Sequence, residues 1–136
     1  MEASVRQFVR ERAGFRCEYC KLSQFEGVTI QFHIEHIRPR QHGGDDSIQN
    51  LALACSNCNW YKGPNLSAID PQTDLTTRLY HPRVDLWRNH FTLDELEIMG
   101  LTDIGRATVR LLRMNAPEPI EFRESLRARG ELNLDD

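Results

Sequence analysis

Four side chains suited to metal-assisted hydrolysis lie close together in the first half of this 136-residue chain: Glu35, His36, Asn50 and Asn59. A carboxylate is a hard oxygen ligand for Mg²⁺ or Mn²⁺, and an amide oxygen can join the same shell. An imidazole titrates near physiological pH and can act as a general base. Phosphodiester cleavage needs such a base, a cation near the leaving oxygen and a group that holds the base in place. The four residue types are therefore compatible with that chemistry.

Two C-x-x-C pairs bracket this stretch and account for all the cysteines of the chain, Cys17, Cys20, Cys55 and Cys58. Each C-x-x-C turn presents two sulfurs to one ion, and two turns complete the tetrahedral shell of structural zinc. The N-terminus has no apolar signal core, so we expect a cytoplasmic chain whose thiols stay reduced. The cysteines predict a closed structural Zn²⁺ site. Two disulfides or four unrelated buried thiols are the alternatives.

The elements that must position these groups follow from the pattern around them. Residues 28–37 are rich in β-branched and aromatic types, which predicts a strand, and residues 51–54 predict a second one. A helix is expected over 55–62, because Gly63 provides a natural stop. The middle of the chain therefore predicts strand, loop, strand and helix, with the cysteine pairs at its two ends.

The predicted strand poses a geometric problem, because neighbours on a strand face opposite ways. Glu35 and His36 can both reach one cleft only if a bend before Pro39 swings His36 round. On the predicted helix, Asn59 and Lys62 are three residues apart and share a face. We therefore expect Lys62 to lie near a bound phosphate.

The rest of the chain predicts supporting elements. An N-terminal helix over 4–13 is expected, capped by Ser4. Residues 65–89 are turn-rich with possible short strands, and two late helices are predicted over 104–114 and 119–128. The predicted fold is α+β, in a single domain. It comprises a core of about 14–63, the helix 4–13 and a C-terminal extension over 64–130.

The central stretch resembles the HNH family of ββα-metal (His-Me finger) nucleases, in the zinc-binding subset with two C-x-x-C knuckles. The positions that carry the resemblance are Glu35-His36, Pro39, Gly43-Gly44, Asn50-Leu51 and the C-x-x-C-N-x-x-K run from Cys55 to Lys62.

The resemblance implies a ββα-metal core and a role for each residue. His36 would activate water, Asn50 would brace the loop and orient His36, and Glu35 and Asn59 would hold the catalytic Mg²⁺ or Mn²⁺. Many relatives have Asp at the position of Glu35, and often His at that of Asn59. The implied reaction is one-metal hydrolysis that leaves 5′-phosphate and 3′-hydroxyl ends.

The overall charge argues mildly against a nucleic-acid partner, since the formal net charge is −3. The charge is uneven, however, and Arg38, Arg40 and Lys62 lie close to the motif. A local basic patch can dominate the field near a cleft. We therefore expect these three side chains to contact phosphates of DNA, or of RNA as an alternative. No apolar run approaches the roughly 20 residues that span a bilayer, so no membrane partner is expected.

Two other functions are compatible with parts of the pattern. A non-catalytic zinc module that binds nucleic acid would keep the cysteines but would not need Glu35, His36 and Asn59 together. A zinc-stapled protein-interaction domain would show no salt-sensitive DNA binding. Trp60 and Trp87 are expected to be buried or half-buried in any of these proteins.

Overall fold

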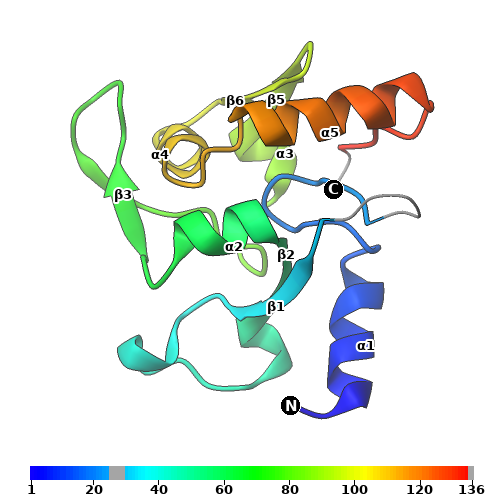
Figure 1. Ribbon diagram of the computed structural model, residues 1–136. Helices are drawn as coiled ribbons and strands as arrows, with labels where there is room; N and C mark the ends of the chain where they lie inside the picture. The colour runs from blue at the N-terminus through cyan, green and yellow to red at the C-terminus, as the bar shows by residue number, and fades with distance from the viewer. Residues whose placement is uncertain (25–29, 135–136) are drawn as a thin grey trace.

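The computed structural model of the protein describes residues 1–24 and 30–134. Its described part is α+β, as predicted, with small antiparallel sheets of two strands each (Figure 1). In chain order the elements are α1 Ala3–Arg12, β1 Phe32–His36, η1 Arg40–His42, η2 Ile48–Asn50, β2 Leu51–Cys55, α2 Ser56–Lys62, β3 Ser67–Ile69, β4 Thr76–Arg78, α3 Trp87–His90, β5 Phe91–Asp94, β6 Glu97–Gly100, α4 Asp103–Leu111 and α5 Pro117–Ala128.

The predicted strand, loop, strand and helix are present as β1, β2 and α2. β1 pairs antiparallel with β2, with Glu35 opposite Ala52 and His36 opposite Leu51. α2 follows β2 directly, and Gly63, with φ of +50°, ends it. Part of the strand predicted over 28–37 falls outside the described residues, and the observed strand covers Phe32–His36.

β2 is buried along its whole length because both of its faces are covered. Leu51 and Leu53 point to one side and pack against Val9 of α1. Ala52 and Ala54 point to the other side and join the larger core, which contains the cysteines and much of the extension. The alternation of side chains along a strand produces this division.

The N-terminal helix differs from the prediction at its start. α1 begins at Ala3, and the residue at its N-cap position makes no side-chain hydrogen bond, so Ser4 lies inside the helix and does not cap it. Gly14, with φ of +65°, follows its end. Burial of Val9 against β2, rather than a cap, holds this helix in place.

The extension contains a hairpin that the sequence pattern does not reveal. β5 and β6 pair antiparallel and pack against α4 (Figure 1). The contact is close, because a Cβ added to Gly100 of β6 would lie 2.3 Å from the backbone nitrogen of Arg106 in α4. Thr102 caps α4, and its Oγ1 accepts a hydrogen bond of 3.0 Å from the Gly105 amide.

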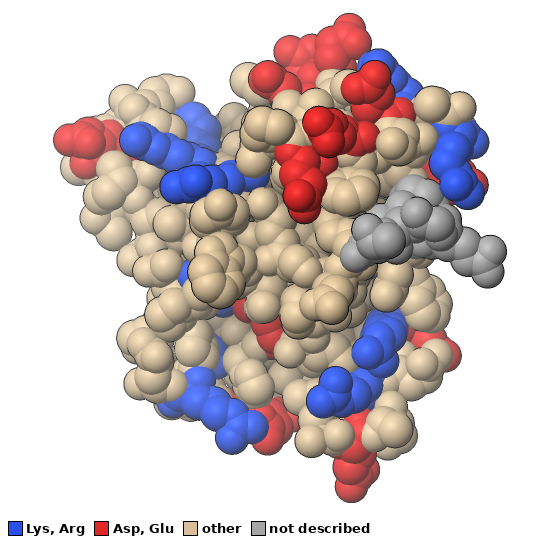
Figure 2. Space-filling model, in the orientation of Figure 1, with Lys and Arg blue, Asp and Glu red and all other residues tan. Residues whose placement is uncertain are grey.

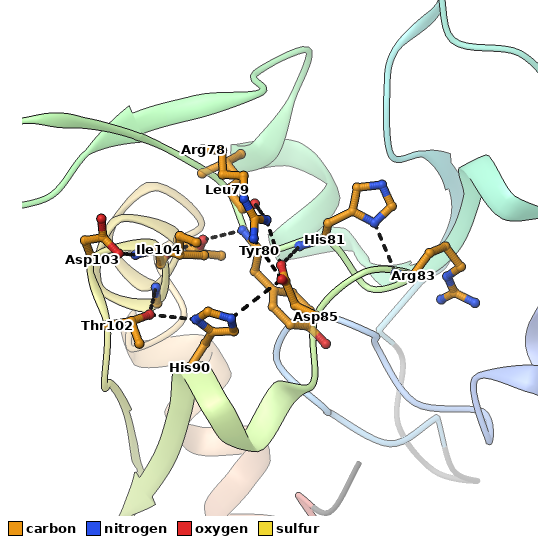
Figure 3. Close-up of polar contacts among 12 residues, drawn as sticks. Arg78, Leu79, Tyr80, His81, Arg83, Asp85, His90, Thr102, Asp103 and Ile104 are labelled. Atoms are coloured by element: carbon orange, nitrogen blue, oxygen red, sulfur yellow. Dashed lines mark hydrogen bonds and ion pairs between the residues drawn. The ribbon is translucent and has the colours of Figure 1, made fainter.

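A polar network centred on Asp85 ties the parts of the extension together (Figure 3). The Asp85 carboxylate accepts two hydrogen bonds of 2.8 Å from Arg78 and one of 2.9 Å from the His81 amide. It also lies 3.7 Å from Nε2 of His90, whose Nδ1 is 2.7 Å from Oγ1 of Thr102. The bonds from Arg78 hold the pKa of Asp85 below its ordinary value. The network joins the segment after β4 to α3 and α4.

The extension also packs directly on the first cysteine knuckle. The indole of Trp87, which is buried as expected, donates a hydrogen bond of 2.7 Å to the carbonyl of Tyr19. Arg83 forms an ion pair with Glu18, and Glu18 in turn accepts a bond of 2.8 Å from the Leu53 amide. The extension and the core that precedes it therefore share one interior. No helix in the described ranges is long and apolar enough to cross a membrane.

Candidate metal centre and catalytic site

The four cysteines form one buried cluster. Their sulfur atoms all lie within 4.8 Å of one another, and those of Cys20 and Cys55 are 3.7 Å apart. Tetrahedral zinc with bonds of about 2.3 Å places its sulfur ligands about 3.8 Å from one another. The geometry therefore fits a structural zinc site with no ligand position left for substrate.

The thiols also need a cation for electrostatic reasons. Hydrogen bonding to Cys17 raises the pKa of Cys55 and Cys58, whereas hydrogen bonding to Cys17 lowers the pKa of Cys20. Four thiolates this close repel one another, so all four can ionise together only around a positive ion.

Glu35 lies beneath the surface with a protein partner on each carboxylate oxygen. Its side chain is 7% exposed. Oε1 accepts a hydrogen bond from the Tyr19 hydroxyl, and Oε2 lies 3.2 Å from Nζ of Lys62. Burial raises the pKa of Glu35, and the charge of Lys62 opposes that shift. Burial also raises the pKa of Tyr19, so its hydroxyl stays protonated and donates.

Lys62 is not the surface cation that its spacing from Asn59 led us to expect. Its side chain is only 2% exposed, and Nζ donates a hydrogen bond of 3.0 Å to the carbonyl of Ile37 besides pairing with Glu35. The three-residue spacing placed Lys62 on the correct side of α2, but its long side chain turns inward. A buried carboxylate is costly without a cationic partner, and Lys62 fills that role.

His36 faces the other way along β1 and is half-buried. Its Nε2 lies 2.6 Å from Oδ1 of Asp46, and Arg40 donates to both oxygens of the same carboxylate at 2.7 and 2.9 Å. The bond from His36 holds the pKa of Asp46 below its ordinary value. When Nε2 carries the proton that Asp46 accepts, Nδ1 keeps an open lone pair. No residue in the described part of the chain hydrogen-bonds to Nδ1.

Asp46 was not identified in the sequence analysis. It lies in the Gly-Gly-Asp-Asp turn, and only closure of the loop brings it to His36. Asn50 ties this loop through three hydrogen bonds: it accepts from the Arg38 amide at 2.8 Å and donates to the carbonyls of Arg38 and Asp45 at 3.0 and 2.8 Å. The sequence signal that could have indicated Asp46 is its place as an acidic residue shortly before Asn50 in the same loop.

Gly44 makes this loop closure possible. A Cβ added there would lie 1.7 Å from the carbonyl oxygen of Arg38, so no larger residue fits without moving the backbone. The guanidinium of Arg38 donates to the carbonyl of His42, and its side chain is exposed. Arg38 is therefore part of the loop and still reaches solvent.

Glu35, His36 and Asn59 contribute to the wall of one open hollow of about 610 Å³. Arg40 and Trp60 line it as well, whereas Asn50 supports the loop behind it. The indole of Trp60 is 79% exposed, so the expectation that it is buried or half-buried was wrong. Its place on the short helix α2 leaves it facing the hollow instead of the core. The hollow therefore brings residues that carry an imidazole, a carboxylate, an amide and a guanidinium to one place, with the carboxylate of Glu35 itself beneath the surface.

One family model matches the chain, and its description is HNH endonuclease. The match covers residues 17–64, from the first cysteine of the cluster to just beyond α2. It therefore includes both C-x-x-C pairs and the walls of the hollow, and it leaves the extension outside. No curated protein and no solved structure matches this chain.

Proposed function

We propose that this chain, whose residues 17–64 belong to the HNH endonuclease family, hydrolyses phosphodiester bonds of DNA with His36 as the general base. The observation that supports this most strongly is the shared hollow, which is lined by His36, Glu35 and Asn59, together with the free Nδ1 of His36 among the described residues. A zinc module that only binds nucleic acid has no need for an imidazole held in this way.

In the proposed reaction, a water molecule donates a proton to Nδ1 of His36 and attacks phosphorus in line with the 3′ oxygen. The new P–O bond forms as the P–O3′ bond breaks, which leaves a 5′-phosphate and a 3′-hydroxyl once the departing oxygen takes up a proton. Asp46 accepts a hydrogen bond from Nε2–H of His36 throughout, and the proton stays on Nε2. It therefore keeps the ring in the productive tautomer and stabilises the imidazolium that forms.

Glu35 and Asn59 would hold the catalytic Mg²⁺ or Mn²⁺, since both residues carry hard oxygen donors and line the same hollow. When bound, this ion would stabilise negative charge on the departing 3′ oxygen. Each oxygen of Glu35 has a second lone pair beyond the one engaged by Tyr19 or Lys62. Lys62 favours the ionised form of Glu35 and orients its carboxylate, so Lys62 acts inside the protein and not on the substrate.

Arg40, which lines the hollow, and Arg38, in the same loop, are the proposed phosphate contacts, because both residues are exposed. Arg40 also pairs with Asp46, so a phosphate drawn to Arg40 would lie next to the group that orients the base.

Plasmid nicking in Mg²⁺ or Mn²⁺ tests the proposal directly. His36→Ala should lower the rate by about 10²- to 10⁴-fold, the usual contribution of a general base. His42→Ala is the matched control, since this exposed histidine lies in the same loop and its imidazole hydrogen-bonds only the carbonyl of Pro64 among the described residues. It should keep most of the activity. Equal inactivity of wild type and His36→Ala, with DNA binding retained, would favour the non-catalytic module.

A further inference from the structure

A second open hollow lies between α2, the β3–β4 hairpin and α4, and its volume is about 670 Å³. We call it the α4 groove. Its lining consists of Tyr61, Ala68, Ile69, Asp74, Ala107, Arg110, Leu111 and Arg113. Most of these residues belong to the extension, beyond the matched segment 17–64.

The α4 groove carries two cations that have no acidic partner. Arg110 and Arg113 are both exposed, and neither forms an ion pair with a described residue. The guanidinium of Arg113 lies over the ring of Tyr61, 4.5 Å from its centroid, which restrains it in the groove. Figure 2 shows basic side chains gathered beside α4, while acidic ones gather above, over α5 and the β5–β6 hairpin. In a chain with a net charge of −3, this local excess favours an anionic ligand.

The α4 groove is connected to the catalytic hollow through α2. Trp60 lines the hollow and Tyr61, the next residue, lines the groove. A helix with its side chains is about 10–12 Å across. A nucleic-acid strand rises about 3.4 Å per nucleotide, so roughly three nucleotides would span the helix. The exposed ring of Trp60 offers an unpaired base a stacking surface on the way.

We propose that a single DNA strand leaving the catalytic hollow crosses α2 over Trp60 and continues in the α4 groove, where Arg110 and Arg113 contact its phosphates. The inference rests on the proposed function for the strand's starting point. The strand is recognised by its charge and its stacked base, so the contact carries no sequence preference. Asp74 is the one carboxylate of the lining, and it limits the affinity of the groove.

The first test measures binding of the zinc-loaded full chain carrying His36→Ala to a labelled single-stranded oligonucleotide at several salt concentrations. Adding Arg110→Gln and Arg113→Gln should reduce the slope of log K against log salt by about 1.4, that is 0.7 for each lost phosphate contact. Near 0.1 M salt the affinity should fall roughly 10- to 25-fold.

The matched control removes the same charge from α1, at Arg6 and Arg10, where neither hollow has a lining residue. This double variant should leave the slope nearly unchanged. An equal loss of slope in both double variants would mean that overall charge, and not the groove, attracts DNA, and the inference would then be wrong.

Two further variants give responses that a folding defect would not produce. Asp74→Asn should tighten binding about two- to fivefold, since it removes the repulsive charge. The parent should gain affinity as the oligonucleotide lengthens from about four nucleotides to one that fills both hollows, and the arginine variants should lose most of that gain, because only a longer strand occupies the hollow and the groove together. A loss that is independent of length would contradict the proposed path.

Cleavage assays separate this inference from the proposed function. In the active enzyme the arginine variants should raise KM and leave kcat unchanged, since the groove touches no reacting atom. If the wild type binds DNA through the α4 groove but does not cut it, the nuclease proposal is wrong, and the proposal that the groove binds DNA remains supported. If cleavage depends on His36 but the arginine variants bind and cut as wild type at every length, only the groove inference fails.

Discussion

The half-buried imidazole of His36 has one nitrogen fixed and one open. Asp46 engages Nε2 at 2.6 Å and is itself anchored by Arg40. Asp46 touches no substrate in the proposed mechanism, so it is a positioning residue. Its effect should appear in the chemical step and not in binding.

Asp46→Asn should lower kcat about 10- to 100-fold, the range typical of partners that orient a functional side chain, with KM unchanged. Asp45→Asn is the control, because the neighbouring carboxylate hydrogen-bonds only Ser47. Steady-state cleavage rates and zinc content of both variants check this. Partial recovery in Asp46→Glu would support an orienting role, whereas a rise in KM alone would assign Asp46 to substrate binding.

Glu35 and Lys62 form a buried ion pair. Removal of one partner leaves the other charge buried without a counter-ion. Lys62→Met should destabilise the fold by about 3–5 kcal/mol, since an unpaired carboxylate would stay inside. Combining it with Glu35→Gln should recover much of the loss, because the neutral amide can still accept from Tyr19. Denaturant unfolding measures both. If Lys62→Met had unchanged stability but bound DNA more weakly, Lys62 would contact phosphate, as the sequence first led us to expect.

At the scale of elements, the β3–β4 hairpin is held to α4 by one buried ion pair. Asp70 follows β3, and Arg106 of α4 donates to both of its oxygens at 2.9 and 2.8 Å. The hydrogen bond from Arg106 holds the pKa of Asp70 well below its ordinary 3.8. This pair positions one wall of the α4 groove against the other.

The shifted pKa makes this contact sensitive to acid. Because the folded state binds the Asp70 proton less readily than the unfolded state, the pair stabilises the fold above pH 3.8 and loses that effect as the pH falls below it. Asp70→Asn should therefore be less stable than wild type at neutral pH, and the difference should shrink in acid. Paired unfolding curves across this range test the prediction. If the difference in stability between Asp70→Asn and wild type did not vary with pH, ionisation of Asp70 would not be the cause of the stabilisation.

At the scale of the whole molecule, the cysteine cluster and the extension share one interior. The larger core contains the four cysteines together with residues of the extension, Tyr80, Trp87, Phe91, Ile98, Leu112, Met114 and Leu126. We propose that the chain unfolds as one unit. A structural zinc ion supplies on the order of 10 kcal/mol of folding free energy.

Chelation of zinc should therefore expose Trp87, which lies in the extension and far along the chain from the first knuckle. Trp60→Phe leaves Trp87 as the only tryptophan, since the chain has two. Its emission should shift to longer wavelength on chelation and return when zinc is restored. Emission typical of a buried indole after chelation would show that the extension folds independently.

Much of the core was predictable because its signals are local. The C-x-x-C pairs, the strand pattern before Pro39 and Gly63 after α2 each act through neighbouring residues. The β5–β6 hairpin was missed because its short strands carry charged residues, as at Asp94 and Glu97, and pairing with each other and packing on α4 stabilise them.

The sequence by itself determined which chemical groups are present and in which order the local elements carry them: thiols in pairs, an acid beside an imidazole, and an amide on a short helix. Only the tertiary structure decided where each group points. It turned Lys62 inward to neutralise Glu35, brought Asp46 back to His36 and left Trp60 exposed. Residue type and spacing set reactivity and local conformation, whereas burial and pairing depend on segments distant in the chain that meet only when the protein folds.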